Sequence, residues 1–196
     1  MSENGISLVV GLGNPGNQYT ETRHNVGFWF LERLQTQLGF QMREEKKFKA
    51  YTGNFILDGQ QVRVAAPTTF MNLSGQAVAP IASFYRIPVD QILIVHDELD
   101  LDPGVIRLKV GGGHGGHNGL RNIIPALGDN KFSRIRIGIG HPGHKDKVAS
   151  YVLNKPQGEE RLLVENALDE TLQFMPEIIG GKMQKAMGRL HTKKPS

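Results

Sequence analysis

The 196-residue sequence contains no cysteine. It can therefore form neither a disulfide framework nor a thiolate metal site, and this absence is typical of proteins from reducing compartments. The chain also lacks any run of about 20 apolar residues, the length that a membrane-spanning helix needs. Its N-terminal segment has no basic region followed by an apolar one, so no secretory signal is predicted. We expect a cytoplasmic protein that makes no contact with a membrane.

Trp and Tyr are also few, with one Trp and four Tyr. Proteins whose main task is to bind single-stranded nucleic acid usually stack the bases on such side chains. The composition therefore argues against a non-catalytic RNA-binding module.

Acidic residues are scarce in two segments of the chain. Residues 103–145 contain seven Lys or Arg and one acid, and residues 182–196 contain five basic residues and no acid, although the formal net charge is only +4. Such asymmetry is typical of proteins that bind a polyanion. A solvated basic surface is the alternative interpretation of the same pattern.

Hydrophobic periodicity alternates between strand and helix patterns along the chain. Strands are predicted at residues 6–11, 48–57, 61–66, 91–95, 105–110 and 135–140, and helices at residues 25–38, 74–85, 118–127, 159–175 and 182–190. Asp58-Gly59 predicts a tight hairpin turn, and Ser74 is the predicted N-cap of its helix. We expect one α/β domain over residues 1–196, a three-layer α/β/α arrangement around a mixed, mostly parallel twisted sheet, with a basic C-terminal helix near 182–191.

Gly11, Gly13 and Gly16 form a G-x-G-x-x-G pattern directly after the first predicted strand. In a dinucleotide-binding turn a helix must begin within this motif, so that its N–H groups face the pyrophosphate. Here Pro15 disfavours a helix at the residue before it, and helical periodicity begins only at Val26. The acidic residue expected about 20 positions later, at the end of a second strand, is also missing. The motif therefore does not indicate a nucleotide site.

Polar side chains instead follow several predicted strands where each strand ends. Because the carboxyl ends of parallel strands meet at one edge of an α/β sheet, we expect these side chains to meet there. They are Asn14, Asn72, His96, Asp97, His114, His117 and Asn118, with His24 on a loop that returns to the same edge.

Two chemistries suit this set of residues. In the first, His24 is a general base that activates water, and Asp97 fixes its tautomer and stabilises the imidazolium, while asparagine amides orient the substrate. In the second, His24, His96, Asp97, His114 and His117 bind a metal such as Zn²⁺. His114 and His117 lie in a flexible glycine-rich run, which does not hold them in a fixed geometry for a metal. Both interpretations nevertheless remain open at this point.

Five segments, taken in order, resemble the bacterial peptidyl-tRNA hydrolases. They are VVGLGNPGNQYTETRHNVGF, PTTFMNLSG, VHDELDLDPG, GGGHGGHNGL and RIRIGIGHPG, and they span residues 9–143. The resemblance implies a monomeric α/β enzyme without a metal or other cofactor. Its substrate would be peptidyl-tRNA, whose ester between the peptide and the terminal ribose it cleaves, so that tRNA from stalled ribosomes is recycled.

The resemblance also implies roles for individual residues. His24 matches the base that activates water, Asp97 the carboxylate that keeps it basic, and Asn14 the residue that separates peptidyl from free aminoacyl substrates. Contacts to the peptidyl-tRNA end are implied for Tyr19, Phe70, Met71, Asn72, His117 and Asn118, and contacts to the tRNA 5′ phosphate for Lys109 and Arg136.

Pro80 and Pro125 fall inside two predicted helices and depart from the pattern expected of the family. An internal proline removes one helical hydrogen bond and tends to kink the helix. We expect a local effect on these helices and none on the site.

Overall fold

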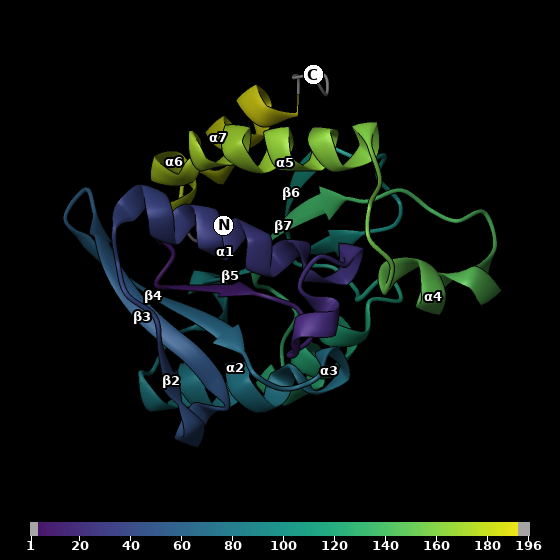
Figure 1. Ribbon diagram of the computed structural model, residues 1–196. Coiled ribbons are helices and arrows are strands. Elements are labelled where there is room, and N and C mark those ends of the chain that lie inside the picture. Colours follow the sequence, from purple (N-terminus) through teal and green to yellow (C-terminus); the bar gives the residue numbers. More distant parts are fainter. Residues whose placement is uncertain (1–3, 192–196) are drawn as a thin grey trace.

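The computed structural model of the protein describes residues 4–191, and seven strands in them form one sheet (Figure 1). The strand order is β2-β3-β4-β1-β5-β7-β6. The four middle strands, β4, β1, β5 and β7, run parallel, and the pairs β2–β3, β3–β4 and β7–β6 are antiparallel. Their bounds are β1 Leu8–Gly11, β2 Arg43–Glu45, β3 Ala50–Leu57, β4 Gln60–Pro67, β5 Ile92–Glu98, β6 Ile106–Val110 and β7 Ser133–Gly138.

Helices cover both faces of this sheet. They are α1 Val26–Leu38, α2 Gly75–Phe84, α3 Asn118–Leu127, α4 Val148–Val152, α5 Glu159–Leu172, α6 Met175–Ile179 and α7 Met183–Leu190. Helices α1, α5, α6 and α7 pack on one face and α2 and α3 on the other, at the top and bottom of Figure 1. The expected three-layer α/β/α class with a mixed sheet is confirmed, and its parallel pairs are the central ones.

The central strands are apolar on both faces because helices cover each of them. In β1, Val9 packs in the core beneath α1, whereas Leu8 and Val10 pack in the core beneath α2 and α3. β5 divides its apolar residues between the two cores in the same way. Continuous apolar runs, rather than alternating ones, therefore mark the strands whose ends carry the site.

The glycines of the G-x-G-x-x-G pattern allow α1 to pack closely against β1. A Cβ on Gly11 would lie 2.4 Å from the carbonyl oxygen of Gly27, and one on Gly27 would lie 2.6 Å from the main-chain nitrogen of Leu12. After Gly16 the chain forms a short 3₁₀ turn, and α1 begins only at Val26. The glycine spacing thus serves close packing, and no α-helix begins within the motif.

Several local predictions are confirmed and some are wrong. Asp58 and Gly59 both adopt positive φ in the turn between β3 and β4, as the hairpin signal predicts. Ser74 does not cap α2: a 3₁₀ turn leads directly into the helix, and the Ser74 hydroxyl donates back to the carbonyl of Met71. Pro80 and Pro125 are exposed and lie inside α2 and α3, which continue past them.

The C-terminal region differs from the prediction in its segmentation. The helix expected over residues 159–175 ends at Leu172, and α6 follows as a separate short helix with Pro176 in its first turn. The predicted basic helix is α7, which is held to the edge strand β6 because the main-chain N–H of Leu108 donates to Nε2 of His191. Lys193 and Lys194 of the basic tail lie outside the described residues. Among residues 4–191, no helix has the length and apolarity to cross a bilayer.

Candidate functional site

His24 and Asp97, 73 positions apart in the sequence, meet at the carboxyl edge of the sheet. His24 lies in a 3₁₀ turn directly before α1, and Asp97 is the penultimate residue of β5. Nδ1 of His24 lies 2.8 Å from Oδ2 of Asp97, and both residues are buried. The expected contact between this imidazole and this carboxylate is therefore present.

The second oxygen of Asp97 binds another histidine. Nε2 of His117 lies 2.7 Å from Oδ1 of Asp97, while Nδ1 of His117 accepts from the main-chain N–H groups of Gly119 and Leu120 at the start of α3. Since Nδ1 of His117 is an acceptor, its proton is on Nε2, which donates to the carboxylate. Asp97 therefore accepts from both histidines, and in neutral His24 the other ring nitrogen, Nε2, carries no proton.

Burial and charge shift the pKa values of His24 and Asp97 in opposite directions. Burial alone lowers the pKa of His24, but the charge of Asp97 and the hydrogen bond to it raise that pKa above its ordinary value. Burial alone would raise the pKa of Asp97, but the histidines at its two oxygens hold it well below its usual range. The carboxylate thus stays ionised and makes His24 a stronger base.

Of the five residues in the metal hypothesis, only three come together. His24, Asp97 and His117 offer ligand atoms within 4.8 Å of one another. The His96 ring lies beside that of His117, with centroids 4.9 Å apart, but its Nδ1 donates to the main-chain oxygen of Asp97, and burial, aided by His117, lowers its pKa to about 3. Nδ1 of His114 accepts from a main-chain N–H in its own loop. A five-ligand site is therefore wrong for this fold, and the three remaining residues already hydrogen-bond to one another.

Asn14 follows β1 and is held from two sides. Its Oδ1 accepts from the main-chain N–H of Met71 at 2.7 Å, and its own main-chain N–H donates to Oδ1 of Asn25, whose amide donates back to the Asn14 carbonyl. Because Oδ1 of Asn14 already accepts this hydrogen bond, the group of the side chain that can bind a ligand is its NH₂. The sequence did not lead us to predict that Asn25 holds Asn14. Its position next to His24, at the start of a predicted helix, could have indicated this role.

The remaining predicted substrate contacts lie around Asn14 and His117. The rings of Tyr19 and Phe70 meet edge to face with centroids 6.3 Å apart, and 54% of Phe70 is exposed. Met71 is buried next to Asn14, and Asn72 is exposed beside it. Asn118 begins α3, is exposed, and accepts a hydrogen bond from Arg121. Met71 is tied to Asn14 by a hydrogen bond, and Asn118 directly follows His117, which binds Asp97.

Arg23 is a second residue that sequence reasoning missed. It is buried, and its guanidinium donates to Glu160 and to the carbonyls of Tyr151 and Asn154. Its carbon Cζ also lies 3.9 Å from the centre of the Tyr151 ring. Arg23 therefore ties the loop that carries His24 to α4, to α5 and to the segment between them.

The basic residues of β6 and β7 share one face of the sheet. In the antiparallel register Arg107 pairs with Arg136 and Lys109 with Arg134, so the four side chains point to the same side. Arg134 is buried and donates to the carbonyls of Gly112 and Gly113, which fixes the glycine-rich loop.

Lys109 and Arg136 remain partly exposed on this face. The Lys109 side chain packs so close to Gly112 that a Cβ there would lie 2.6 Å from Lys109 Nζ. Nη1 of Arg136 lies 3.8 Å from Oε1 of Glu98, which is a long ion pair. Both cations are therefore placed by the sheet and are accessible to an anion.

Comparison with known proteins assigns the chain to a family. The family model described as peptidyl-tRNA hydrolase matches residues 8–196. The peptidyl-tRNA hydrolases of Pectobacterium carotovorum and Haemophilus influenzae are 55% and 54% identical over 192 and 193 residues, which cover 97% and 98% of this chain and 98% of each relative. The crystal structure of the peptidyl-tRNA hydrolase of Acinetobacter baumannii superposes with a TM-score of 0.95 at 48% identity, covering all of this chain and 98% of the other. The carboxylate shared by two histidines thus lies in a chain that belongs to the peptidyl-tRNA hydrolase family.

Proposed function

We propose that this chain hydrolyses the ester between a peptide and the 3′-terminal ribose of tRNA, with His24 as the general base. The observation that carries the proposal is the carboxylate of Asp97 held between His24 and His117, which leaves Nε2 of His24 free to accept a proton. The activity itself follows from membership of the family and from the close match in fold.

The reaction needs no nucleophilic side chain. Nε2 of His24 removes a proton from water as the water oxygen attacks the ester carbonyl, and the resulting imidazolium then gives this proton to the ribose oxygen as the ester bond breaks. Asp97 stabilises the imidazolium between these two steps. We assign Asn72 and Asn118, which carry exposed amides and directly follow Met71 and His117, to orienting the carbonyl and stabilising its developing negative charge. Tyr19, Phe70, Met71 and His117 form the surrounding contact surface.

The same residues support one competing hypothesis, a metal-dependent hydrolase that uses His24, Asp97 and His117 as ligands. The two hypotheses differ in their response to a chelator: the base mechanism keeps its activity in EDTA, and the metal mechanism loses it. We also propose that the protein acts as a monomer, as its resemblance to the family implies.

Asn14 should distinguish peptidyl from aminoacyl substrates. A peptidyl group presents a neutral amide to the Asn14 NH₂ group, whereas a free aminoacyl group would bring an ammonium without a counter-ion to a buried site. Replacing Asn14 by Ala or Asp should lower the ratio of kcat/KM for N-acetyl-aminoacyl-tRNA over aminoacyl-tRNA about ten- to a hundredfold, the value of one buried hydrogen bond. Release of the labelled amino acid from both substrates, in EDTA, measures the ratio. Asn17→Ala, on the exposed turn nearby, is the control, and an unchanged ratio in the Asn14 variants would refute this role.

Lys109 and Arg136 should bind a phosphate of the tRNA. Each phosphate contact releases counter-ions, so the double variant K109A/R136A should bind tRNA more weakly and lower the slope of log K against log salt by about 2. The control is R43A/K46A, which removes two exposed cations at the opposite edge of the sheet. A salt titration of tRNA binding gives both slopes, and the role is excluded when the K109A/R136A slope equals that of the wild type.

A further inference from the structure

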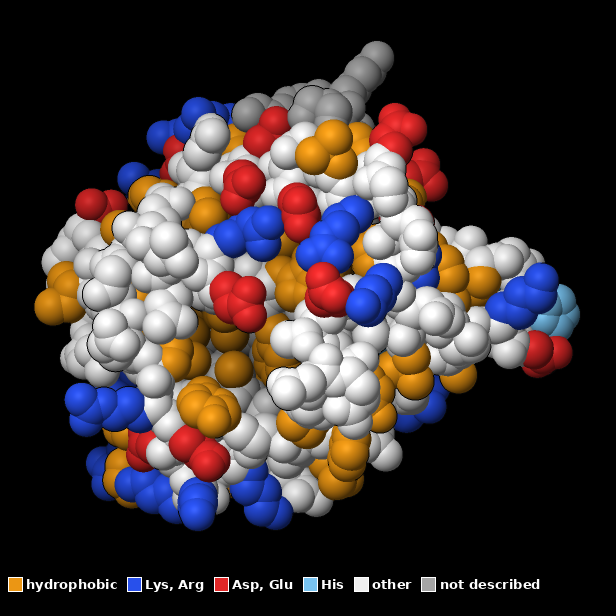
Figure 2. All heavy atoms as spheres, in the orientation of Figure 1, with side chains coloured by type: hydrophobic (Ala, Val, Ile, Leu, Met, Phe, Trp, Pro, Cys, Tyr) orange, Lys and Arg blue, Asp and Glu red, His pale blue; other side chains and the backbone are white. Residues whose placement is uncertain are grey.

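An apolar groove begins beside Asn14 and runs along α1. It has a volume of about 470 Å³, within the range of ligand sites, and its near end is formed by Pro15, Gly16 and Thr68. These residues follow Asn14 and precede Phe70, so the groove is continuous with the candidate site. Figure 2 shows the hollow in this face, with hydrophobic side chains inside it and acidic side chains beside it.

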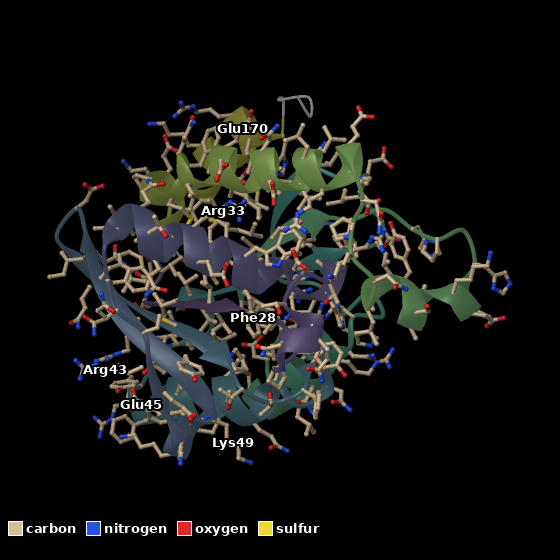
Figure 3. The ribbon with its side chains drawn as sticks, viewed as in Figure 1. Phe28, Arg33, Arg43, Glu45, Lys49 and Glu170 are labelled. Carbon is tan, nitrogen blue, oxygen red and sulfur yellow. The ribbon has the colours of Figure 1, made fainter. Side chains whose placement is uncertain are left out.

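One wall of the groove is a single face of α1. Phe28, Leu31, Glu32 and Gln35 are spaced three and four residues apart, and the sheet residues Tyr51 and Ala66 lie opposite them. Figure 3 shows Phe28 below α1, away from Arg33, which points toward α5. A Cβ on Gly13 would lie 2.5 Å from the Phe28 ring, so Phe28 marks the end of the groove that is nearest to the site.

The groove and the strands β6 and β7, which carry the basic residues, lie on opposite sides of the site. In the sheet, β6 and β7 flank β5 on one side, and β4 and β3 flank β1 on the other. Asp97 lies near the end of β5 and Asn14 follows β1, so the site lies between the proposed phosphate contacts and the groove. A substrate whose tRNA lies on β6 and β7 therefore directs its other end, the peptide, toward the groove.

We infer that this groove binds the peptide of the substrate in an extended form, an inference that rests on the proposed function. From Phe28 to Gln35 the helix rises about 10 Å, which an extended chain of about three residues spans. The apolar walls suit apolar side chains. Glu32 and Glu44 are exposed on the lining and have no ion-pair partner within residues 4–191, so they disfavour acidic side chains in the peptide.

Peptide length is the first readout. With wild type, kcat/KM should rise about tenfold from N-acetyl-aminoacyl-tRNA to a tetrapeptidyl-tRNA and stay level for longer peptides, because further residues extend beyond the groove. Gln35→Trp, which fills the far end, should remove most of this rise, measured as the ratio of kcat/KM on tetrapeptidyl-tRNA to kcat/KM on N-acetyl-aminoacyl-tRNA. Gln37→Trp is the matched control, because Gln37 is exposed on the same helix outside the groove.

Charge is the second readout. Wild type should cleave a tripeptidyl-tRNA with an internal Lys about threefold faster than one with Asp, and Glu32→Gln should reduce this preference. Glu170→Gln is the control, because Glu170 lies on α5 on the other side of α1 (Figure 3).

The outcomes separate the two proposals. Failure of wild type to cleave even N-acetyl-aminoacyl-tRNA would refute the proposed function. Cleavage at a rate independent of length, or equal loss on all substrates in Gln35→Trp, would refute the groove assignment alone. A concentration-dependent dimer that Gln35→Trp abolishes, with no length effect, would assign the groove to a second copy of the chain.

Discussion

Replacing His24 should reduce kcat on N-acetyl-aminoacyl-tRNA by a factor on the order of 10²–10⁴, the usual contribution of a general base. Nε2 of His24 is the nitrogen that the Asp97 contact leaves free, so its removal takes away the acceptor for the proton of water. Single-turnover hydrolysis at saturating enzyme measures the loss without interference from binding.

Because His24 is buried, His24→Ala also removes packing, and a folding defect must be distinguished from loss of the base. His24→Asn makes this distinction, since its amide NH₂ can still donate to Asp97 and nothing replaces Nε2. We expect both variants to bind tRNA as the wild type does and to lose similar activity. His144→Ala, at an exposed histidine in the segment before α4, is the control. Full activity in His24→Asn would require another base.

Asp97→Asn should have the second largest effect, a fall in kcat on the order of 10³. The carboxylate accepts from Nδ1 of His24 and from Nε2 of His117 at the same time, whereas an amide has one acceptor oxygen and must turn its NH₂ toward one of the two donors. In Ser-His-Asp triads the equivalent change costs about 10⁴ because the histidine adopts the wrong tautomer. Asp100→Asn, at an exposed residue three positions later, is the control.

The pH profile gives a readout specific to Asp97. His24 acts as a base only when it is unprotonated, so activity rises with pH through the pKa of His24, which Asp97 raises above its ordinary value. Without the carboxylate, burial is the remaining effect and lowers this pKa, so the acid limb of kcat/KM should move to lower pH in Asp97→Asn. An acid limb at the wild-type position would show that a different group titrates.

Local sequence signals were enough for most of the secondary structure. The apolar run before Gly11 and the period of α1 identified a strand and a helix, because apolar side chains at these spacings must face a core. The pattern failed where local and tertiary preferences compete. Ser74 carries a good capping side chain, yet the turn before it already has helical geometry, and its hydroxyl donates to Met71 instead.

The α/β class and the polar residues at the strand ends could be predicted from the sequence, because both depend on spacing along the chain, and the resemblance of five segments indicated the family. The packing of strands and helices brings two histidines to Asp97, turns Nδ1 of His96 to the main-chain oxygen of Asp97, and lets Asn25 and Arg23 hold the loops of the site. These contacts join residues that are distant in sequence or depend on which way a ring nitrogen faces. Hydrogen bonds act over about 3 Å, and such distances are set by how the strands and helices pack rather than by any local pattern.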